Sequence, residues 1–417
     1  MNGFFSGMCQ KREQGMKNVL LLPGARWQVK LAERLKSMGM SLTVIDPHSD
    51  APCVALADRY FPCDLRNRQD ILDFCSQEKF DAVISDECDI AMPLVSQIGA
   101  ELGLPALSVE DAMVYTDKFL MRQKCREAGV DCPDFRLCED VDAAIDFFRH
   151  LNGPMIIKPV DSNASRGVYL VENEEDLRAK FDLTLAFSRG RHALLAEEYV
   201  RGREFTVDGL KTRSGHMTLA ISEKRHYDHN PNVASELLFT NDNERFDYGL
   251  LKKVNDRFVA ATTLEFGLTH AEYKFSNGRF YQIEIAARGG GTLISSVIAP
   301  FMSGVDSYAY LIGCATGAPP NEPPANQYGA NRRAAILKFF EVTGNGGKVR
   351  RIVGEGYLKS NPCIREYQFA FNVGDVIRKA TSDSDRAGFY IACCETREEL
   401  DRIVGEVSRE VYFEYEE

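Results

Sequence analysis

The sequence of 417 residues lacks long apolar runs. Its first stretch, MNGFFSGMCQKREQG, contains no apolar run of the signal-peptide kind, and no later segment approaches the ~20 apolar residues needed to span a bilayer. We therefore expect a cytoplasmic protein with no membrane partner. A strong strand pattern begins after Met16, so residues 1–16 are expected to be a tail.

The sequence also lacks an excess of positive charge. Lys and Arg number 50 against 61 Asp and Glu, which gives a formal net charge of -11. This balance disfavours non-specific binding to nucleic acids or anionic membranes. We expect small-molecule substrates and no nucleic-acid partner, and we leave a homodimer open.

Cysteine is plentiful, but the sequence lacks the cysteine spacing that is typical of structural zinc sites. The 12 cysteines are scattered along the chain without a pair of CxxC motifs. Disulfide bonds are uncommon in proteins that carry no export signal. We expect reduced thiols with a mostly structural role.

A dinucleotide-binding motif is absent from the first domain. The segments NVLLLPG and SLTVID are buried-strand patterns around a helix, and a second helix precedes FDAVIS. This order predicts a parallel α/β domain over residues 17–113. Because only Gly24 lies in the first turn, without G-x-G-x-x-G, Asp46 is interpreted as a loop aspartate and not as a ribose ligand.

A proline-rich segment, GAPPNEPPANQ, predicts a boundary near residue 320. Residues 114–320 are expected to form the central α/β domain. Residues 321–417 are expected to form a small α+β domain, with strands at AAILKFFEV and GFYIACC and a helix that begins with a capping box of Thr396 and Glu399.

Two lysines precede segments suited to phosphate binding. A helix capped by Thr116 and ended by Gly129 would place Lys118 in its first turn. The segment PMIIKPVDSNASRGV places Lys158 at the end of a buried strand, before a loop of small residues that ends at Gly167. Such a loop can lay backbone N–H groups over phosphates while a lysine supplies charge, although a strand-end lysine is also commonly solvated.

Acidic residues surround a turn in LLAEEYVRGREFTVDGL. In a nucleotide cleft, Glu197 would accept from the adenine amino group, and the backbone near Glu198 and Val200 would meet the ring edge. Glu204 would hold the ribose hydroxyls. The alternative is that these carboxylates are solvated surface charges.

The segment HAEYKFSNGRFYQIEIAARGGG predicts a hairpin around Asn277-Gly278. With a plain two-residue turn, Glu272 would oppose Ile283, and Glu284 would point to the other side. Two carboxylates that share Mg²⁺ must lie on one face. We therefore predict an odd loop or a one-residue bulge, which Gly278 makes feasible, so that Glu272 and Glu284 can bind the ion together.

Arg288 follows this hairpin in a Gly-rich stretch where the backbone can approach a ligand closely. A planar guanidinium suits a γ-phosphate, a substrate carboxylate and a developing oxyanion. We predict that Arg288 and Lys158 are the catalytic residues.

Together and in this order, the segments resemble the ATP-grasp superfamily over residues 17–320. The resemblance implies a pre-ATP-grasp α/β domain before a two-subdomain ATP-grasp core. The residues it implies for ATP are Lys118, Lys158, Ser162, Ser165, Gly167, Glu197, Glu198, Val200 and Glu204. It implies Glu272 and Glu284 as ligands of Mg²⁺ or Mn²⁺, and Arg288 beside the transferred phosphate.

The stretches ARGGGTLISSVIAPFMSGVD and GFYIACCETREEL look most like the branch that contains L-amino acid ligases. That branch implies a carboxylate–amine ligase that forms an amide or peptide bond through an acyl phosphate and releases ADP and phosphate. Its substrates would be a small carboxylate and a small amine. The alternatives are another ATP-grasp enzyme, such as a biotin carboxylase or a carbamoyl-phosphate synthase-like protein, and a non-catalytic ATP-binding module.

One position departs from the superfamily pattern. Members usually carry an asparagine metal ligand two residues after the second metal-binding acid, and this chain has Ala286 there. The departure implies weaker binding of one of two Mg²⁺ ions, a water in place of the ligand, or a loss of activity.

Overall fold

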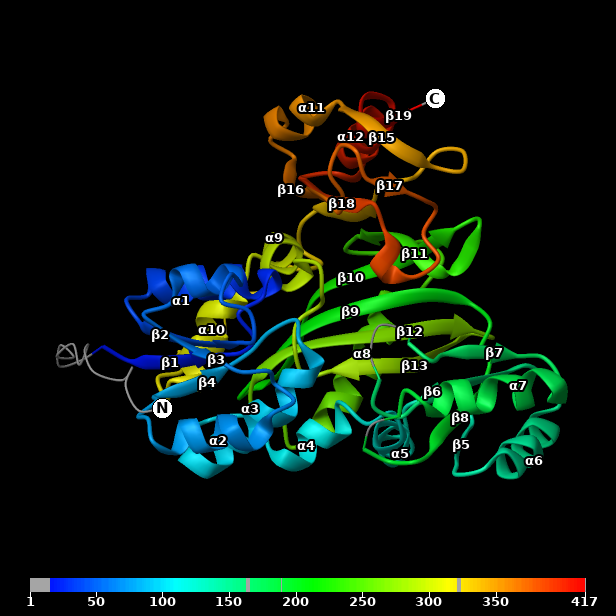
Figure 1. The fold of residues 1–417 in the computed structure, drawn as a ribbon, viewed down its shortest axis with the longest axis horizontal. Coiled ribbons are helices and arrows are strands. Elements are labelled where there is room, and N and C mark those ends of the chain that lie inside the picture. The colour runs from blue at the N-terminus through cyan, green and yellow to red at the C-terminus, as the bar shows by residue number, and fades with distance from the viewer. Residues whose placement is uncertain (1–15, 163–165, 189, 321–323, 417) are drawn as a thin grey trace, which may run out of the picture.

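The computed structural model describes residues 16–162, 166–188, 190–320 and 324–416 (Figure 1). The tail expected at residues 1–16 lies outside the described residues except for Met16. No single helix in the described ranges is long and apolar enough to cross a membrane. One bent pair, Ile294–Ser303 with Ser307–Ala315, passes that test on length and composition, with a bend of 116°.

The N-terminal domain is a four-stranded parallel sheet in the order β3-β2-β1-β4, as the β-α-β pattern predicts. Its strands are β1 (Asn18–Leu21), β2 (Ser41–Asp46), β3 (Arg59–Pro62) and β4 (Ala82–Ile84). Its helices are α1 (Val29–Ser37), α2 (Arg68–Ser76) and α3 (Met92–Leu102). Strand β3 was not predicted from the sequence, because this edge strand is partly exposed and lacks a continuous apolar run.

The first turn of this domain holds a satisfied loop aspartate, as interpreted from the sequence. A carboxylate oxygen of Asp46 accepts hydrogen bonds from the backbone N–H of Gly24 (3.0 Å), and its second oxygen accepts from that of His48 (2.9 Å). A Cβ on Gly24 would lie 2.5 Å from the Val44 side chain. The glycine is therefore required by close packing of the turn.

A four-stranded antiparallel sheet, in the order β5-β8-β6-β7, forms a separate lobe (Figure 1). Its strands are β5 (Phe135–Cys138), β6 (Met155–Pro159), β7 (Tyr169–Val171) and β8 (Leu194–Glu198). Helices α6 (Val141–Leu151) and α7 (Glu174–Leu185) pack on one side of it.

The largest sheet has eight strands in the order β13-β12-β9-β10-β11-β14-β18-β16. Its first five are β9 (Arg203–Thr212), β10 (Gly215–Tyr227), β11 (Asn230–Phe239), β12 (Gly267–Ser276) and β13 (Arg279–Ala286). Helices α5 (Lys118–Ala128) and α8 (Tyr248–Ala260) cover one face of these strands. After β13 come a π-helical turn (Ile294–Ile298), α9 (Ala299–Ser303) and α10 (Ser307–Ala315), which pack toward the N-terminal domain.

The C-terminal part extends the large sheet and adds a smaller one (Figure 1). Strands β14 (Ala334–Phe339), β16 (Ile364–Phe369) and β18 (Gly388–Cys394) continue the large sheet. Strands β15 (Gly347–Val353), β17 (Val376–Ile377) and β19 (Tyr412–Tyr415) form a three-stranded sheet, beside α11 (Glu355–Ser360) and α12 (Arg397–Glu410). The sheet thus continues across the boundary expected near residue 320, and that linker lies partly outside the described residues.

Two helix caps correct the sequence analysis. Helix α5 is capped by Asp117, whose carboxylate accepts from two backbone N–H groups, while the hydroxyl of Thr116 donates to the carbonyl of Ala112. Asp117 is the better cap because a carboxylate accepts both bonds at once. The hydroxyl of Thr396 does cap α12 by accepting from the N–H of Glu399 (3.2 Å). Within the described residues, however, the Glu399 carboxylate returns no hydrogen bond to Thr396.

Candidate active site

The candidate site lies on a polar face of the large sheet. Along each central strand, residues that point to one face alternate with apolar residues that pack under α5 and α8. On β9 the apolar set is Phe205 and Val207. The polar set is Glu204, Thr206 and Asp208 on β9, Ser222 and Lys224 on β10, and His270, Glu272 and Lys274 on β12.

A β-bulge brings the two predicted metal-binding acids together. The Asn277-Gly278 turn is a two-residue turn with positive φ at both positions, and the strands pair regularly from it up to Tyr273 and Gln282. The register then shifts by one residue, at Ile283, and Glu272 lies directly opposite Glu284. The predicted bulge is confirmed, although it lies within β13 and not at the turn.

Arg122 holds the bulge from beneath. Its side chain is fully buried on α5, and Nη2 donates a 2.6 Å hydrogen bond to the carbonyl of Ile283. Its Nε forms a 2.8 Å ion pair with Oε1 of Glu197 on β8. A single guanidinium therefore connects the hairpin to the separate lobe, using its planar fork.

Both predicted phosphate-binding lysines are buried at the junction of these two sheets. Lys118 is 6% exposed, and its Nζ lies 2.9 Å from Oε1 of Glu284 and donates to the carbonyl of Ser162 (2.7 Å). Lys158 is 5% exposed, and its Nζ lies 2.6 Å from Oε2 of Glu197. The solvated alternative for Lys158 is therefore wrong.

The buried cluster contains two cations, Arg122 and Lys158, and one anion, Glu197. One positive charge is therefore not balanced within the cluster. Burial lowers the pKa of Lys158 to about 8, against the opposing effect of Glu197. Burial would raise the pKa of Glu197, but Arg122 and Lys158 hold it below the usual value, so this carboxylate stays charged. The surplus positive charge favours an anion beside Lys158.

Glu197 has a different surrounding from the one predicted for it. Both of its oxygens form ion pairs with buried cations, Arg122 and Lys158. In this structure the carboxylate therefore positions Lys158, and neither oxygen is free to accept from an adenine amino group. Glu198 is exposed, and its N–H donates to the carbonyl of Asp134 (2.8 Å). The N–H of Val200 makes no hydrogen bond to another described residue, so it remains available for a ring edge.

Glu204 lies at the edge of the polar face. Its carboxylate contacts Nε2 of His226 (3.1 Å) and Nζ of Lys274 (3.2 Å). Burial would raise its pKa, but His226 and the lysines on β10 and β12 lower it to about 2. The carboxylate is therefore charged and partly exposed, as a hydroxyl acceptor must be.

Only the two ends of the predicted phosphate loop are described. Ser162 is buried and binds Lys118 through its carbonyl, and Ser165 lies outside the described residues. Gly167 has a φ of +73°, and a Cβ there would lie 2.8 Å from Phe187 and 2.9 Å from Pro159. Glycine is required at this end of the loop by both conformation and packing.

Arg288 is anchored by the N-terminal domain. Its Nε and Nη2 donate to the two oxygens of Asp89 at 2.7 and 2.8 Å, and Nη1 donates to the carbonyl of Gly289. Asp86 accepts from the N–H of Gly289 (2.6 Å), which removes that N–H from the donors available to a substrate. A guanidinium has five N–H groups, so hydrogens on Nη1 and Nη2 remain for a ligand.

His270 occupies the strand position opposite Ala286. Its Nδ1 lies 2.8 Å from Asp208, and its Nε2 lies 3.8 Å from Glu272. Burial would lower the pKa of His270, but Asp208 raises it to about 9. Glu272 also forms a 2.7 Å ion pair with Lys224, so two protein cations already contact this acid.

The pair of Glu272 and Glu284 fits a hard divalent cation. The two carboxylates are hard oxygen donors directly opposite each other, and both side chains are partly exposed, at 34% and 43%. Mg²⁺ prefers one or two carboxylates together with substrate phosphates. The neighbouring lysines would contact those phosphates when a nucleotide is bound.

Five residues of this site were not predicted from the sequence: Asp89, Arg122, Asp208, Lys224 and His270. Period-two alternation in REFTVDGL, SEKRHY and HAEYKF could have identified the last three. Arg122 follows Lys118 by four residues and therefore lies on the same face of α5. No local signal identifies Asp89, because it reaches Arg288 from another domain.

Comparisons with known proteins agree with this geometry. Residues 151–296 match the ATP-grasp domain family, and residues 340–416 match L-amino acid ligase C-terminal domain 2. A formate-dependent phosphoribosylglycinamide formyltransferase of Sulfurisphaera tokodaii is 23% identical over 197 residues, which are 46% of this chain and 50% of that protein. A D-alanine–D-alanine ligase of Desulforudis audaxviator is 33% identical over 116 residues, 27% of this chain and 37% of that protein. The chain thus spans about half the length, or less, of these relatives.

Two solved structures share the fold over nearly the whole chain. An L-amino acid ligase from Bacillus licheniformis superposes with a TM-score of 0.79 at 20% identity, covering 98% of this chain and all (100%) of that one. A phosphoribosylglycinamide synthetase from Anaerococcus prevotii superposes with a TM-score of 0.73 at 18% identity, covering 96% and 100%. The chain therefore carries a segment that matches the ATP-grasp domain family, followed by a segment that matches L-amino acid ligase C-terminal domain 2.

Proposed function

We propose that the protein is an ATP-dependent carboxylate–amine ligase that works through an acyl phosphate. The observation that carries the proposal is the convergence of Glu272, Glu284 and Lys118 on one face, beside Lys158. In this proposal residues 17–113, 114–320 and 321–417 are the three domains.

ATP would lie between the small lobe and the polar face of the large sheet. The backbone near Val200 would meet the adenine edge, and Glu204 would accept from the ribose hydroxyls. Lys118 and Lys158 would contact the phosphates, and their burial strengthens these contacts. Glu272 and Glu284 would hold Mg²⁺, which neutralises part of the triphosphate charge.

The proposed chemistry begins with the carboxylate substrate. A carboxylate is a poor electrophile, so one of its oxygens attacks the γ-phosphorus of ATP, the bond to the β–γ bridging oxygen breaks, and ADP leaves with that electron pair. Lys158 and Arg288 balance the charge around the transferred phosphoryl group. The products of this half-reaction are ADP and an acyl phosphate.

The amine substrate then attacks the activated carbonyl carbon. Arg288 stabilises the tetrahedral oxyanion through its remaining N–H groups, phosphate leaves with the electrons of the C–O bond, and the nitrogen loses a proton to solvent. Asp89 fixes the guanidinium plane during this step. The Gly289 N–H does not contribute to this step, because it is already bonded to Asp86.

Phosphate release from ATP tests the proposal, measured with a panel of amino acids and other small carboxylates and with mass spectrometry of the products. The expected result is phosphate release that depends on both a carboxylate and an amine, with an amide product. Lys158→Ala is the negative control. Turnover that requires bicarbonate and biotin would assign the chain to biotin carboxylases, and ATP binding without turnover on any pair would assign it to binding modules.

A further inference from the structure

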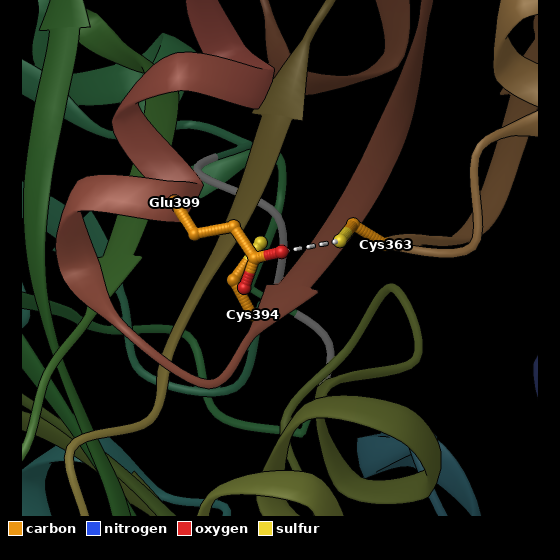
Figure 2. A group of neighbouring side chains, drawn as sticks. All are labelled: Cys363, Cys394 and Glu399. Carbon is orange, nitrogen blue, oxygen red and sulfur yellow. Dashed lines mark hydrogen bonds between the residues drawn. The ribbon is translucent and has the colours of Figure 1, made fainter.

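The C-terminal domain contains a cluster of metal-ligating side chains outside the candidate active site. Cys363, Cys394 and Glu399 each offer one ligand atom, and these atoms all lie within 4.8 Å of one another (Figure 2). Cys363 precedes β16, Cys394 ends β18, and Glu399 lies in the first turn of α12. We propose that these three residues bind a thiophilic divalent metal ion of the Zn²⁺ class.

The separation of the ligand atoms suits such an ion. Bond lengths of ~2.3 Å for Zn–S and ~2.1 Å for Zn–O place two tetrahedral ligands roughly 3.6 Å apart. Sγ of Cys363 already lies 3.6 Å from Oε1 of Glu399, to which the thiol donates. Small rotations of Cys394 complete the triangle, and solvent supplies the fourth position on the exposed side.

Backbone hydrogen bonds and strand pairing hold the two cysteine ligands in place without a metal. The N–H of Cys363 donates to the side chain of Asn361 (2.9 Å), and its carbonyl accepts from the N–H of Cys393 (2.8 Å). Cys394 pairs with Ala334 across the large sheet. A preorganised set of ligands loses little conformational freedom on binding.

The Glu399 side chain points toward the Cys363 thiol. Glu399 occupies the third position of α12, where a capping box would turn its carboxylate back to the N–H of Thr396. Among the described residues that bond is absent, and the carboxylate accepts from Cys363 instead. The Glu399 side chain therefore contacts the thiol of Cys363 and does not complete a capping box.

The donor set selects the class of metal. Two thiolates are soft ligands that favour Zn²⁺ over Mg²⁺ or Ca²⁺, and a glutamate oxygen is also a ligand that Zn²⁺ accepts. Binding breaks two S–H bonds, releases two protons to solvent and forms two metal–sulfur bonds. Affinity for the ion should therefore rise as the pH rises.

Metal titration of the full, reduced chain tests the site in the presence of excess Mg²⁺, which occupies hard oxygen sites. We expect one Zn²⁺ bound per chain, two thiols protected from a thiol reagent, and an ultraviolet sulfur-to-metal charge-transfer band when Cd²⁺ replaces Zn²⁺. Cys363→Ser and Glu399→Gln should each lower the affinity for Zn²⁺. The loss should exceed the ~10–100-fold that follows from removing a residue that only hydrogen-bonds to a metal ligand.

Matched controls come from the neighbouring residues. Cys393 points to the opposite side of β18 from Cys394, and Glu398 is exposed beside Glu399. Cys393→Ala and Glu398→Gln should leave the affinity unchanged. Equal losses in ligand and control variants would overturn the proposal. Absence of the Cd²⁺ band in the reduced wild-type protein would also overturn it. A third contradicting outcome is a Cys363–Cys394 disulfide that forms in air, together with no metal binding after the disulfide is reduced.

Discussion

Glu272 and Glu284 lie directly opposite each other across the β12–β13 hairpin because one extra residue, Ile283, interrupts the register between them. In a regular register without this bulge, Ile283 would oppose Glu272, and Glu284 would point to the apolar face, under α5 and α8. The carbonyl of Ile283 is captured by the buried guanidinium of Arg122, which also pairs with Glu197. The geometry of the two acids thus depends on a residue that touches neither of them.

The first prediction concerns Arg122→Lys. A lysine keeps the charge beside Glu197 but cannot also reach the Ile283 carbonyl with a planar fork. We expect a folded protein whose ATP turnover needs a higher Mg²⁺ concentration, because Glu284 is less firmly placed. A Mg²⁺ titration of turnover measures this effect, with the melting temperature recorded alongside.

Arg126→Lys is the matched control for this variant. Arg126 lies one turn further along α5 and makes a solvent-exposed contact of 3.5 Å with Asp134. Its substitution should change neither the Mg²⁺ requirement nor stability by more than ~1 kcal/mol. An unchanged Mg²⁺ requirement in Arg122→Lys would show that the bulge holds its shape without the guanidinium fork.

The second prediction is that Lys158→Ala lowers turnover by about 100- to 1000-fold, the usual cost of removing one charge-stabilising donor. The fold should survive, because Glu197 keeps its ion pair with Arg122. Lys180→Ala is the control, since Lys180 contacts Asp176 and the carbonyl of Leu170 at the surface of the same lobe. Turnover at the wild-type rate in Lys158→Ala would remove Lys158 from the phosphate site.

The third prediction is a pH dependence. The pKa of Lys158 is lowered to about 8, so its ammonium is charged below that pH and neutral above it. Because the charged form binds phosphate, kcat/KM for ATP should fall as the pH rises through about 8. In Lys158→Arg the fall should move to higher pH, since a guanidinium stays protonated. The same pH profile in both proteins would assign the fall to another group.

The fourth prediction is that Glu284→Gln strongly lowers turnover and that additional Mg²⁺ or Mn²⁺ partly restores it. A neutral amide still offers an oxygen to the ion but no charge. Glu265→Gln, at an exposed loop position, is the control. Full activity of Glu284→Gln at low Mg²⁺ would place the metal elsewhere.

How far the sequence could predict this site depends on which interactions are local. The bulge before Glu284 followed from the period of two along a strand, and the place of Lys118 in a first helical turn followed from signals within a single helix, although its cap is Asp117 and not Thr116. The bond from Arg288 to Asp89 joins residues 199 positions apart, and no periodicity encodes it. The ion pair of Glu197 with Arg122 could not be predicted for the same reason, since Arg122 comes from another element.

The elements of the fold that were predicted from the sequence are likewise those with local signals. Buried strands such as β1 and β18 have apolar runs and were predicted, whereas the partly exposed edge strand β3 was not. The expected boundary near residue 320 followed from proline content. Proline content cannot show that β14 then pairs with β11 and continues the same sheet.

The last prediction concerns Ala286, where the chain departs from the superfamily pattern. Ala286 is 5% exposed, lies two residues after Glu284 on the same face of β13, and opposes His270. An asparagine there would place its carbonyl beside the oxygens of Glu284, so Ala286→Asn should lower the Mg²⁺ concentration needed for half-maximal turnover. A Mg²⁺ titration of wild type against the variant measures this shift.

Ala287→Asn is the control for that experiment, because Ala287 belongs to the apolar core and its substitution should only destabilise the protein. The competing effect at position 286 is overpacking against His270, which typically costs ~1–3 kcal/mol. Overpacking lowers the melting temperature without reducing the Mg²⁺ requirement, so the two measurements separate these effects. An unchanged or higher requirement in Ala286→Asn would show that the site works without a third oxygen ligand. Turnover that appears only in the variant would identify the wild-type chain as a binding module.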